Sequence, residues 1–228
     1  MSDYLAREDA PLSAEDWQRI DNAVIESARK RLVGRRFIGI FGPLGAGAQV
    51  VQNPILSGIN EDRIEVKERD NLAIPLIYKD FKLHWRDIEA AKQYGAPLEL
   101  GPVAAAAAVC ALKEDDLIFN GCDEYGYKGL MNVKGCTSVE AQDWKVPGNA
   151  FQNVVAAVEK LTSAGFYMPY AMAVSPSLYA AMHRVYDGTG ALEIAMIREL
   201  VAAGVFQSPV IKGTGACLLY TSPSPRDR

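Results

Sequence analysis

The sequence has few histidines, few cysteines and no long hydrophobic run, and each shortage narrows what the protein can be. Its two histidines, His84 and His183, have no neighbouring His or Cys at the spacing that metal sites use. The four cysteines are widely separated, as expected of reduced thiols; they are Cys110, Cys122, Cys136 and Cys217. No apolar run reaches the roughly 18 residues of a membrane span, and no signal peptide pattern opens the chain. We expect a cytoplasmic protein that does not contact membranes and has no metal site.

Motifs for catalysis are also missing. The glycine-rich turn at 42–47 is followed by Ala48-Gln49, where a P-loop requires Lys and then Ser or Thr. Neither a dinucleotide fingerprint nor a nucleophile elbow is present. An acidic cluster at 114–116, with Asp123 and Glu124 nearby, has the residue type of a glycosidase or metal site. Carboxylates at a helix end are more often solvated or at a subunit contact, so the sequence predicts no catalytic residue and no enzyme.

Charge argues against general nucleic-acid binding. The chain has a formal net charge of −4 at pH 7 and a hydrophobic content of 49%, which is ordinary for a globular protein. Five cations nevertheless gather within eight residues; they are Arg29, Lys30, Arg31, Arg35 and Arg36. They follow a predicted helix, where the helix dipole favours positive charge, and this explains most of the cluster. Nucleic acid remains the weaker explanation, and we expect no specific nucleic-acid partner.

The strongest helical signal runs through the middle of the chain, from residue 101 to the glycine-punctuated loop that ends near Asn132. Pro102 is tolerated in a first helical turn, and Gly121 provides a left-handed stop. Residues 103–112 carry no charge and include five consecutive alanines. This composition predicts a buried helix against which other backbones can pack closely.

A second helix is predicted over residues 13–34. Ser13 and Asp16 have the spacing of a capping box. Apolar residues then recur at three- and four-residue steps, which indicates one apolar stripe on a surface helix; they are Trp17, Ile20, Val24, Ala28 and Leu32.

Residues 57–85 change to a period of two and predict a long hairpin. Ile64 and Val66 alternate with charged residues, a polar tip follows at 68–71, and residues 74–78 are apolar again. A two-stranded hairpin of this length cannot bury its own faces. It therefore needs a surface, either on another subunit or, as the alternative, on its own domain.

The remaining elements alternate between helix and strand. We expect short strands at 170–174 and 205–212, and helices at 86–94, 149–164, 176–186 and 191–203. Residues 140–212 thus predict a compact α/β unit. The last eleven residues, 218–228, lack an apolar period and are not expected to pack. They look like the translated sequencing adapter found on reading frames assembled from environmental DNA, so we expect them to be foreign to this protein.

Three segments, in order, resemble the encapsulins of the linocin-like family, the shell proteins of bacterial and archaeal nanocompartments. They are PLSAEDWQRIDNAV at 11–24, GRRFIGIFGPLGAG at 34–47 and, most closely, EDDLIFNGCDEYGYKGLMN at 114–132. The likeness covers about residues 1–216 and is expected to stop there. Family members continue for some tens of residues, which implies a chain truncated at its C-terminus.

The resemblance implies an α+β fold, that of the tailed-bacteriophage major capsid protein. Residues 1–56 and 86–139 correspond to a peripheral domain with a spine helix, residues 57–85 to an extended loop, and residues 140–212 to an axial domain. The implied function is self-assembly into an icosahedral shell that encloses cargo enzymes. The cargo is typically a peroxidase or a ferritin-like protein, with a role in oxidative stress or iron storage.

The resemblance also implies sites. Cargo enzymes of the family dock a C-terminal targeting peptide beside the N-terminal helix, and the matching positions here are Ile25, Ala28, Leu32, Arg35, Ile38 and Ile40. A loop matches the fivefold pore of the shell at Tyr186, Asp187, Gly188, Thr189 and Gly190. No cofactor is required, but some members bind flavin through a tryptophan near the end of the extended loop, where this chain has Trp85.

Two other functions stay open at this stage. A phage major capsid protein that packages DNA has the same fold, although such proteins often begin with a scaffolding segment and this chain begins with the cargo-side helix. An enzyme or flavin binder on a capsid-like fold is motivated only by Trp85 and the acidic cluster.

Overall fold

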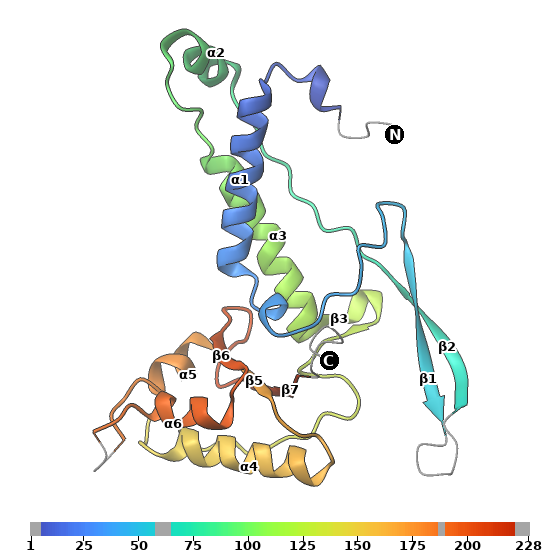
Figure 1. The fold of residues 1–228 in the computed structure, drawn as a ribbon, viewed down its shortest axis with the longest axis vertical. Helices are drawn as coiled ribbons and strands as arrows, with labels where there is room; N and C mark the ends of the chain where they lie inside the picture. The colour runs from blue at the N-terminus through green and yellow to red at the C-terminus, as the bar shows by residue number, and fades with distance from the viewer. Residues whose placement is uncertain (1–5, 58–64, 187–189, 222–228) are drawn as a thin grey trace. The chain divides into compact units, whose positions relative to one another are not determined.

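The computed structural model describes residues 6–57, 65–186 and 190–221, and its helices and small sheets form two compact units (Figure 1). The larger unit combines residues 1–38 with 79–228, and the smaller unit covers 39–78. The mixture of helices and separate sheets agrees with the expected α+β class. Within the described ranges, none of the helices has the length and apolar character needed to cross a bilayer.

Helix α1 (Ala14–Arg31) begins as the sequence predicts. The Ser13 hydroxyl accepts a hydrogen bond from the Asp16 N–H, and the Asp16 carboxylate accepts one from the Ser13 N–H. This reciprocal pair satisfies two N–H groups that would otherwise lack partners at the helix start. The helix ends three residues before the expected position, because Leu32 already has an extended backbone.

Helix α3 (Gly101–Asn120) is the longest helix described and runs alongside α1 (Figure 1). Pro102 lies in its first turn, and Gly121 ends it with a φ of 73°. The expectation of a helix buried all round is wrong. Val103, Ala107 and Phe119 are buried, whereas Val109 is largely exposed on another face. The helix is therefore packed on one side only.

The loop after α3 returns on itself. Strands β3 (Gly121–Cys122) and β4 (Tyr127–Lys128) pair in an antiparallel ladder, with Gly126 in the left-handed conformation between them. A Cβ at Gly129 would overlap the backbone at Phe119, so only glycine fits at this close approach. The predicted glycine-punctuated loop is thus confirmed, and Gly129 also begins the next turn, since its carbonyl accepts the Asn132 N–H at 3.1 Å.

The smaller unit contains a hairpin, but its strands differ from those expected. Strand β1 (Val50–Ser57) pairs antiparallel with β2 (Glu65–Ala73). The residues predicted as a polar tip, 68–71, lie inside β2, and residues 74–84 form no strand. The period-two pattern thus correctly predicted a hairpin but assigned its strands to the wrong residues. The reason is that a polar run in an exposed strand resembles a turn.

Helix α2 (Trp85–Tyr94) follows the predicted position to within one residue, and Gly95 ends it with a φ of 64°. Beyond α3, the chain forms a separate core around a three-stranded sheet of order β6-β5-β7. Strand β5 (Tyr170–Val174) is central, parallel to β6 (Gly204–Gln207) and antiparallel to β7 (Ala216–Tyr220). The sheet packs with α4 (Asn149–Ser163), α5 (Pro176–Ala181) and α6 (Glu193–Leu200) (Figure 1).

Three predictions in this region need correction. Helix α5 ends at Ala181 and not near Tyr186, since residues 182–186 turn back toward α6 and Val185 bridges to Leu192. Strand β6 stops at Gln207: the Ser208 N–H still donates to the Val174 carbonyl of β5, but Pro209 follows and has no N–H to continue the ladder. Strand β7 shows that residues 218–220 do pack, contrary to expectation: Leu218 lies against the core, and Tyr170 pairs with Tyr220 in register.

A second, smaller core joins the end of α3 to this sheet. Phe119 is fully buried with Ala173 of β5, and Val33 and Ile211 complete the cluster. Phe37 stacks on Phe206 at 5.4 Å between ring centroids. The turn after α1, the end of α3 and the sheet therefore form one packed junction.

Glu193, at the start of α6, stabilises the start of α4. Its side chain is 1% exposed, and its Oε1 accepts a hydrogen bond from the Phe151 N–H at 2.8 Å. The residue preceding α4 is Gly148, which has no side chain to cap the helix. The backbone N–H of Glu193 donates to the carbonyl of Arg184. One carboxylate thus replaces a local cap and holds α6 against α4.

We expect Glu193→Ala to lower the free energy of unfolding by about 1–2 kcal/mol, because the Phe151 N–H loses its acceptor. Glu193→Gln keeps one carbonyl oxygen for that N–H, so the expected loss is smaller. Urea unfolding of the two variants and the unchanged protein measures the difference. Equal losses for Ala and Gln would show that the hydrogen bond to Phe151 does not contribute.

Candidate functional site

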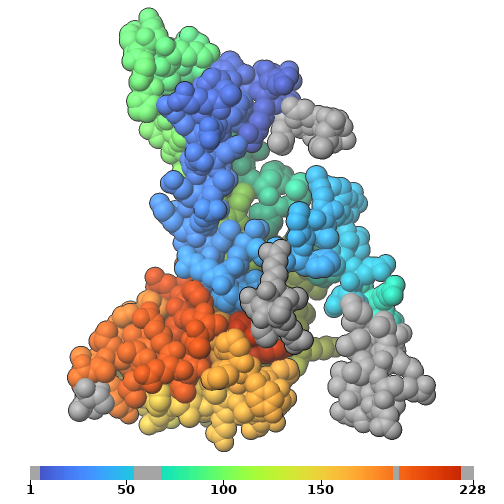
Figure 2. Space-filling model, viewed as in Figure 1, coloured from blue at the N-terminus to red at the C-terminus, as the bar shows by residue number. Residues whose placement is uncertain are grey.

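The candidate site is the C-terminal half of α1 and the turn that follows it. Ile25 and Ala28 are three residues apart and share one face of α1, and Leu32 follows directly after the helix with its N–H still bonded to the Ala28 carbonyl. Ile25 is 44% exposed, while Ala28 and Leu32 are half-buried. In the space-filling view, side chains of α1, coloured blue, lie open to solvent on the face shown (Figure 2). These three side chains form an accessible apolar strip.

The turn after α1 is held by a buried carboxylate from α3. Asp115 is 0% exposed, its Oδ2 accepts the N–H of Val33 at 2.8 Å, and its Oδ1 accepts the N–H of Gly34 at 3.1 Å. Gly34 lies so close to Ile118 that a Cβ there would press on that side chain, 3.0 Å from its nearest carbon. The turn is fixed to α3 through its backbone, and this determines where Arg35 and Ile38 lie.

The other predicted members of the strip differ in position. Arg35 is exposed and forms a two-bond ion pair with Glu114 of α3, in which Nη2 lies 2.9 Å from Oε2. Hydrogen bonding to Glu114 raises the pKa of the Arg35 guanidinium. Ile38 is half-buried, and its N–H donates to the Gly34 carbonyl. Ile40 is 69% exposed and belongs to the smaller unit.

The acidic cluster is explained by its hydrogen bonds. Glu114 pairs with Arg35, Asp115 holds the turn, and Asp116 accepts from the Asn120 amide at 2.8 Å and from Lys113 at 3.2 Å. Each of the three carboxylates therefore has a structural partner. Among the residues that the structure describes, no group of three or more His, Cys, Asp or Glu side chains could hold a metal ion.

One of the four cysteines, Cys217, is buried. All four are free, and burial raises the pKa of the Cys217 thiol to about 11, which keeps it protonated at neutral pH.

The structure describes Trp85 and the two ends of the predicted pore loop. Tyr186 donates its N–H to the carbonyl of Ala191, which closes the base of the loop. Asp187, Gly188 and Thr189 lie outside the described residues, and Gly190 has a φ of 68°. Trp85 is the first residue of α2 and is 68% exposed, with the guanidinium of Arg86 over its ring at 5.5 Å.

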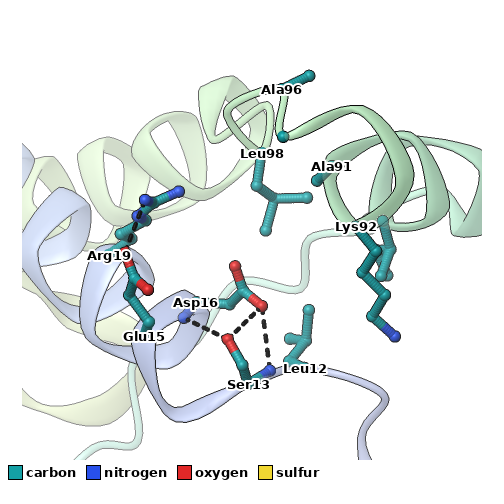
Figure 3. Close-up of a pocket in the computed structure, with 11 residues that line it drawn as sticks. Leu12, Ser13, Glu15, Asp16, Arg19, Ala91, Lys92, Ala96 and Leu98 are labelled. Atoms are coloured by element: carbon teal, nitrogen blue, oxygen red, sulfur yellow. Dashed lines mark hydrogen bonds and ion pairs between the residues drawn. The ribbon is translucent and has the colours of Figure 1, made fainter.

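A hollow of about 270 Å³ lies between the start of α1 and the end of α2 (Figure 3). Leu12, Ala91 and Leu98 supply apolar wall, and Arg19 forms an ion pair with Glu15 at 2.8 Å. The polar groups of Ser13 and Asp16 are already used in the capping box. Trp85 is not among the described residues that line this hollow, so the two features are separate.

Comparison with known proteins identifies the family. The family model described as "Encapsulating protein for peroxidase", Linocin_M18, matches residues 1–226. The chain belongs to this family. The match extends beyond residue 216, so the expectation that the likeness stops there is wrong. Residues 222–228 lie outside the described structure, and their expected foreign origin stays a prediction.

Individual members of the family agree with this assignment. The chain is 42% identical to the type 1 encapsulin shell protein EncA of Myxococcus xanthus, over 100% of this chain and 83% of that protein. It is 44% identical to a diheme-cytochrome-encapsulin shell fusion protein of Kuenenia stuttgartiensis, over 92% of this chain and 61% of that protein.

A solved structure confirms the fold predicted from the resemblance. The virus-like particle from Pyrococcus furiosus has a TM-score of 0.71 to this chain, covering 92% of it and 81% of the other chain. Their sequence identity is 16%, so this likeness supports the capsid-like fold alone.

Sequence reasoning located the apolar strip but missed the residues that hold it. The sequence predicts Glu114 and Asp115 to be solvated or at a subunit contact, with a catalytic or metal site as the weaker alternative. The helical period places both on α3, yet no local pattern reveals that α1 ends beside them. The spacing of 81 residues between Gly34 and Asp115 makes this contact a property of the tertiary structure.

The substitution Asp115→Asn tests whether burial or hydrogen bonding has the larger effect on the pKa of this carboxylate. Burial raises the pKa of Asp115 above its ordinary value of 3.8, although the two N–H donors oppose the shift. The folded state then binds the proton more tightly than the unfolded state. The contribution of Asp115 to the free energy of unfolding is fully present below about pH 3.8. It is lost as the pH rises through the pKa of the folded state.

The stability difference between the unchanged protein and Asp115→Asn should therefore shrink as pH rises from about 4 to about 7. Urea unfolding of both proteins across this pH range measures the difference in the free energy of unfolding. Groups that titrate equally in both proteins do not contribute to this difference. A difference that grows with pH would mean that the two N–H donors outweigh burial.

Proposed function

We propose that the protein is a shell subunit that self-assembles into an icosahedral nanocompartment and encloses cargo enzymes. The observation that carries this proposal is the family match over residues 1–226, together with 42% identity to a type 1 encapsulin shell protein over the whole chain. A phage capsid protein has the same fold but is not favoured by these relatives. A structural role, without catalysis, is also consistent with the paired carboxylates described above.

The smaller unit supports assembly. Its hairpin has two strands and cannot bury its own faces. The flanking residues expose large apolar side chains, with Phe41 at 80% and Leu76 at 84%. Apolar surface of this kind is typical of protein interfaces. Because the family forms shells, neighbouring copies of the chain are the partners we propose for it.

The cargo is proposed from the family and its fused members. The family description names peroxidase, and two relatives carry a diheme cytochrome or a ferritin-like protein in the same chain as the shell protein. An enzyme for oxidative stress or iron storage, enclosed in a cytoplasmic shell, is the corresponding proposal here. A separate cargo enzyme would dock its C-terminal targeting peptide on the strip formed by Ile25, Ala28 and Leu32, with Ile38 and Ile40 as further contacts.

Two further assignments belong to this proposal. The loop from Tyr186 to Gly190 would lie near the fivefold pore. The shell requires no cofactor, and flavin binding at Trp85 is a second candidate activity, supported by the exposure of its ring.

Electron microscopy of the purified protein should show uniform closed shells. Leu76→Asp should reduce the fraction of closed shells severalfold, because it places a charge on an apolar surface proposed to be buried between copies. Leu76→Met, which keeps the apolar character of this surface, should leave assembly intact. Dispersed monomers from the unchanged protein would contradict the proposal, and shells filled with DNA would favour the phage capsid alternative.

Leu32→Asp should abolish capture of a targeting peptide without stopping assembly, because a carboxylate replaces the central apolar contact of the strip. Leu32→Met, which keeps the apolar character, should retain capture. Binding of a fluorescent peptide to assembled shells measures both. Unchanged capture by Leu32→Asp would show that the peptide binds elsewhere.

A further inference from the structure

The turn between β3 and β4 places two tyrosines side by side. Tyr125 ends a short 3-10 turn, Asp123–Tyr125, and Tyr127 begins β4. Gly126 lies between them with a φ of 73°, a conformation that favours glycine and turns the chain sharply. The centroids of the two phenol rings are 6.4 Å apart, and the ring planes are inclined by 51°. The fold of the turn therefore keeps the two phenols in contact range.

The two rings differ in their access to solvent. Tyr125 is 67% exposed, whereas Tyr127 is half-buried and pairs with Cys122 in the ladder. Lys128 donates to Asp123 at 2.6 Å across the same turn, which helps to keep it closed. A dissolved oxidant can thus reach Tyr125, and this exposed ring can change rotamer while the ring of Tyr127 stays in place.

Other tyrosines of the described structure have different neighbours. Tyr220 stacks on Phe166 at 4.8 Å, and the ring of Tyr179 lies 4.7 Å from that of His183. Tyr167 is 68% exposed, but no ring pair joins it to a second tyrosine within the described ranges. Neither phenylalanine nor histidine has a phenolic hydrogen to lose. The turn between β3 and β4 is therefore the place where coupling of two phenols is to be expected.

We propose that Tyr125 and Tyr127 form an oxidation site, at which a peroxidase and hydrogen peroxide join the two rings into an intramolecular dityrosine. The source of the oxidant rests on the proposed function, since the family is described as encapsulating a peroxidase. The new bond closes a covalent ring around Gly126 and restricts the turn that follows α3. A chain that has met the oxidant is thereby marked permanently.

The reaction balances with hydrogen peroxide as the oxidant. Each tyrosine loses one electron and one proton from its phenol group and becomes a phenoxyl radical. The two radicals join through a carbon–carbon bond between ring carbons next to the phenol oxygens, and the hydrogens on those carbons move to the oxygens. Hydrogen peroxide takes up the two electrons and two protons and becomes two molecules of water.

Proximity favours coupling within one chain. Two groups held next to each other react as if each were present at a very high concentration, whereas groups on separate copies must first meet. Tyr125 and Tyr127 belong to the same turn, so they need no contact between copies of the chain. The expected product is a cross-link inside one chain.

The test treats the assembled protein with a purified haem peroxidase and hydrogen peroxide, and then digests it with trypsin. Cleavage after Lys113 and Lys128 releases one peptide, 114–128, in which Tyr125 and Tyr127 are the two tyrosines. This peptide should lose the mass of two hydrogen atoms and show the blue fluorescence of dityrosine. An unaltered peptide, or two copies of the peptide joined to each other, would overturn the inference.

Single substitutions assign the product to the pair. Tyr125→Phe and Tyr127→Phe should each reduce the dityrosine fluorescence of this peptide to background, because one phenol is missing. Tyr167→Phe removes a tyrosine of similar exposure from another loop and should leave the product unchanged. A product that persists in either member's Phe variant would contradict the pairing.

Cys122 requires a separate control, because it lies in the same peptide and a bond between its sulfur and a tyrosine ring also removes two hydrogen atoms. Cys122→Ser should keep both the mass loss and the fluorescence. Disappearance of the mass loss in Cys122→Ser would replace the proposed dityrosine by a cysteine–tyrosine bond and overturn the inference.

Electron microscopy of the same sample separates this inference from the proposed function. Closed shells whose peptide 114–128 is unaltered would overturn the oxidation site and leave the shell function in place. Dispersed chains that still form the product would contradict the shell function and support the site, because both tyrosines belong to one chain.

Discussion

The arrangement of the larger unit depends on one buried carboxylate. Asp115 accepts the backbone N–H groups of Val33 and Gly34, and so ties the end of α1 to the middle of α3. Two N–H groups left buried without an acceptor would cost several kcal/mol in total. The carboxylate is costly to bury, but it is the short polar group that can satisfy both at once. Where α1 stops and how its last turn faces solvent follow from this contact.

The junction around Asp115 also brings the helices to the sheet. Phe119, one turn after Asp115, is buried against Ala173 of β5. Phe37, just after the fixed turn, stacks on Phe206 of β6. The surface that we propose for cargo docking is thereby built on a rigid base, since its helix is held at the end nearest to the charged residues. A docking surface on a fixed element loses little conformational entropy when a peptide binds.

Sequence patterns succeeded where a local interaction decides the structure. The capping box at Ser13 and the stop at Gly121 depend on residues within a few positions, and both were predicted. The hairpin was predicted but its register was not, because the polar residues 68–71 of β2 have no buried face to fix them. Strand β7 was missed because its pairing with β5 joins residues more than 40 positions apart.

The main helices could be predicted from residue type and short-range spacing, whereas the family and the positions Ile25, Ala28 and Leu32 came from the resemblance of whole segments to known shell proteins. Only the tertiary structure decided how the charges near these positions are paired. Arg35 forms its ion pair with Glu114, 79 residues away. An ion pair forms between side chains that the fold brings together, and no local pattern records that proximity.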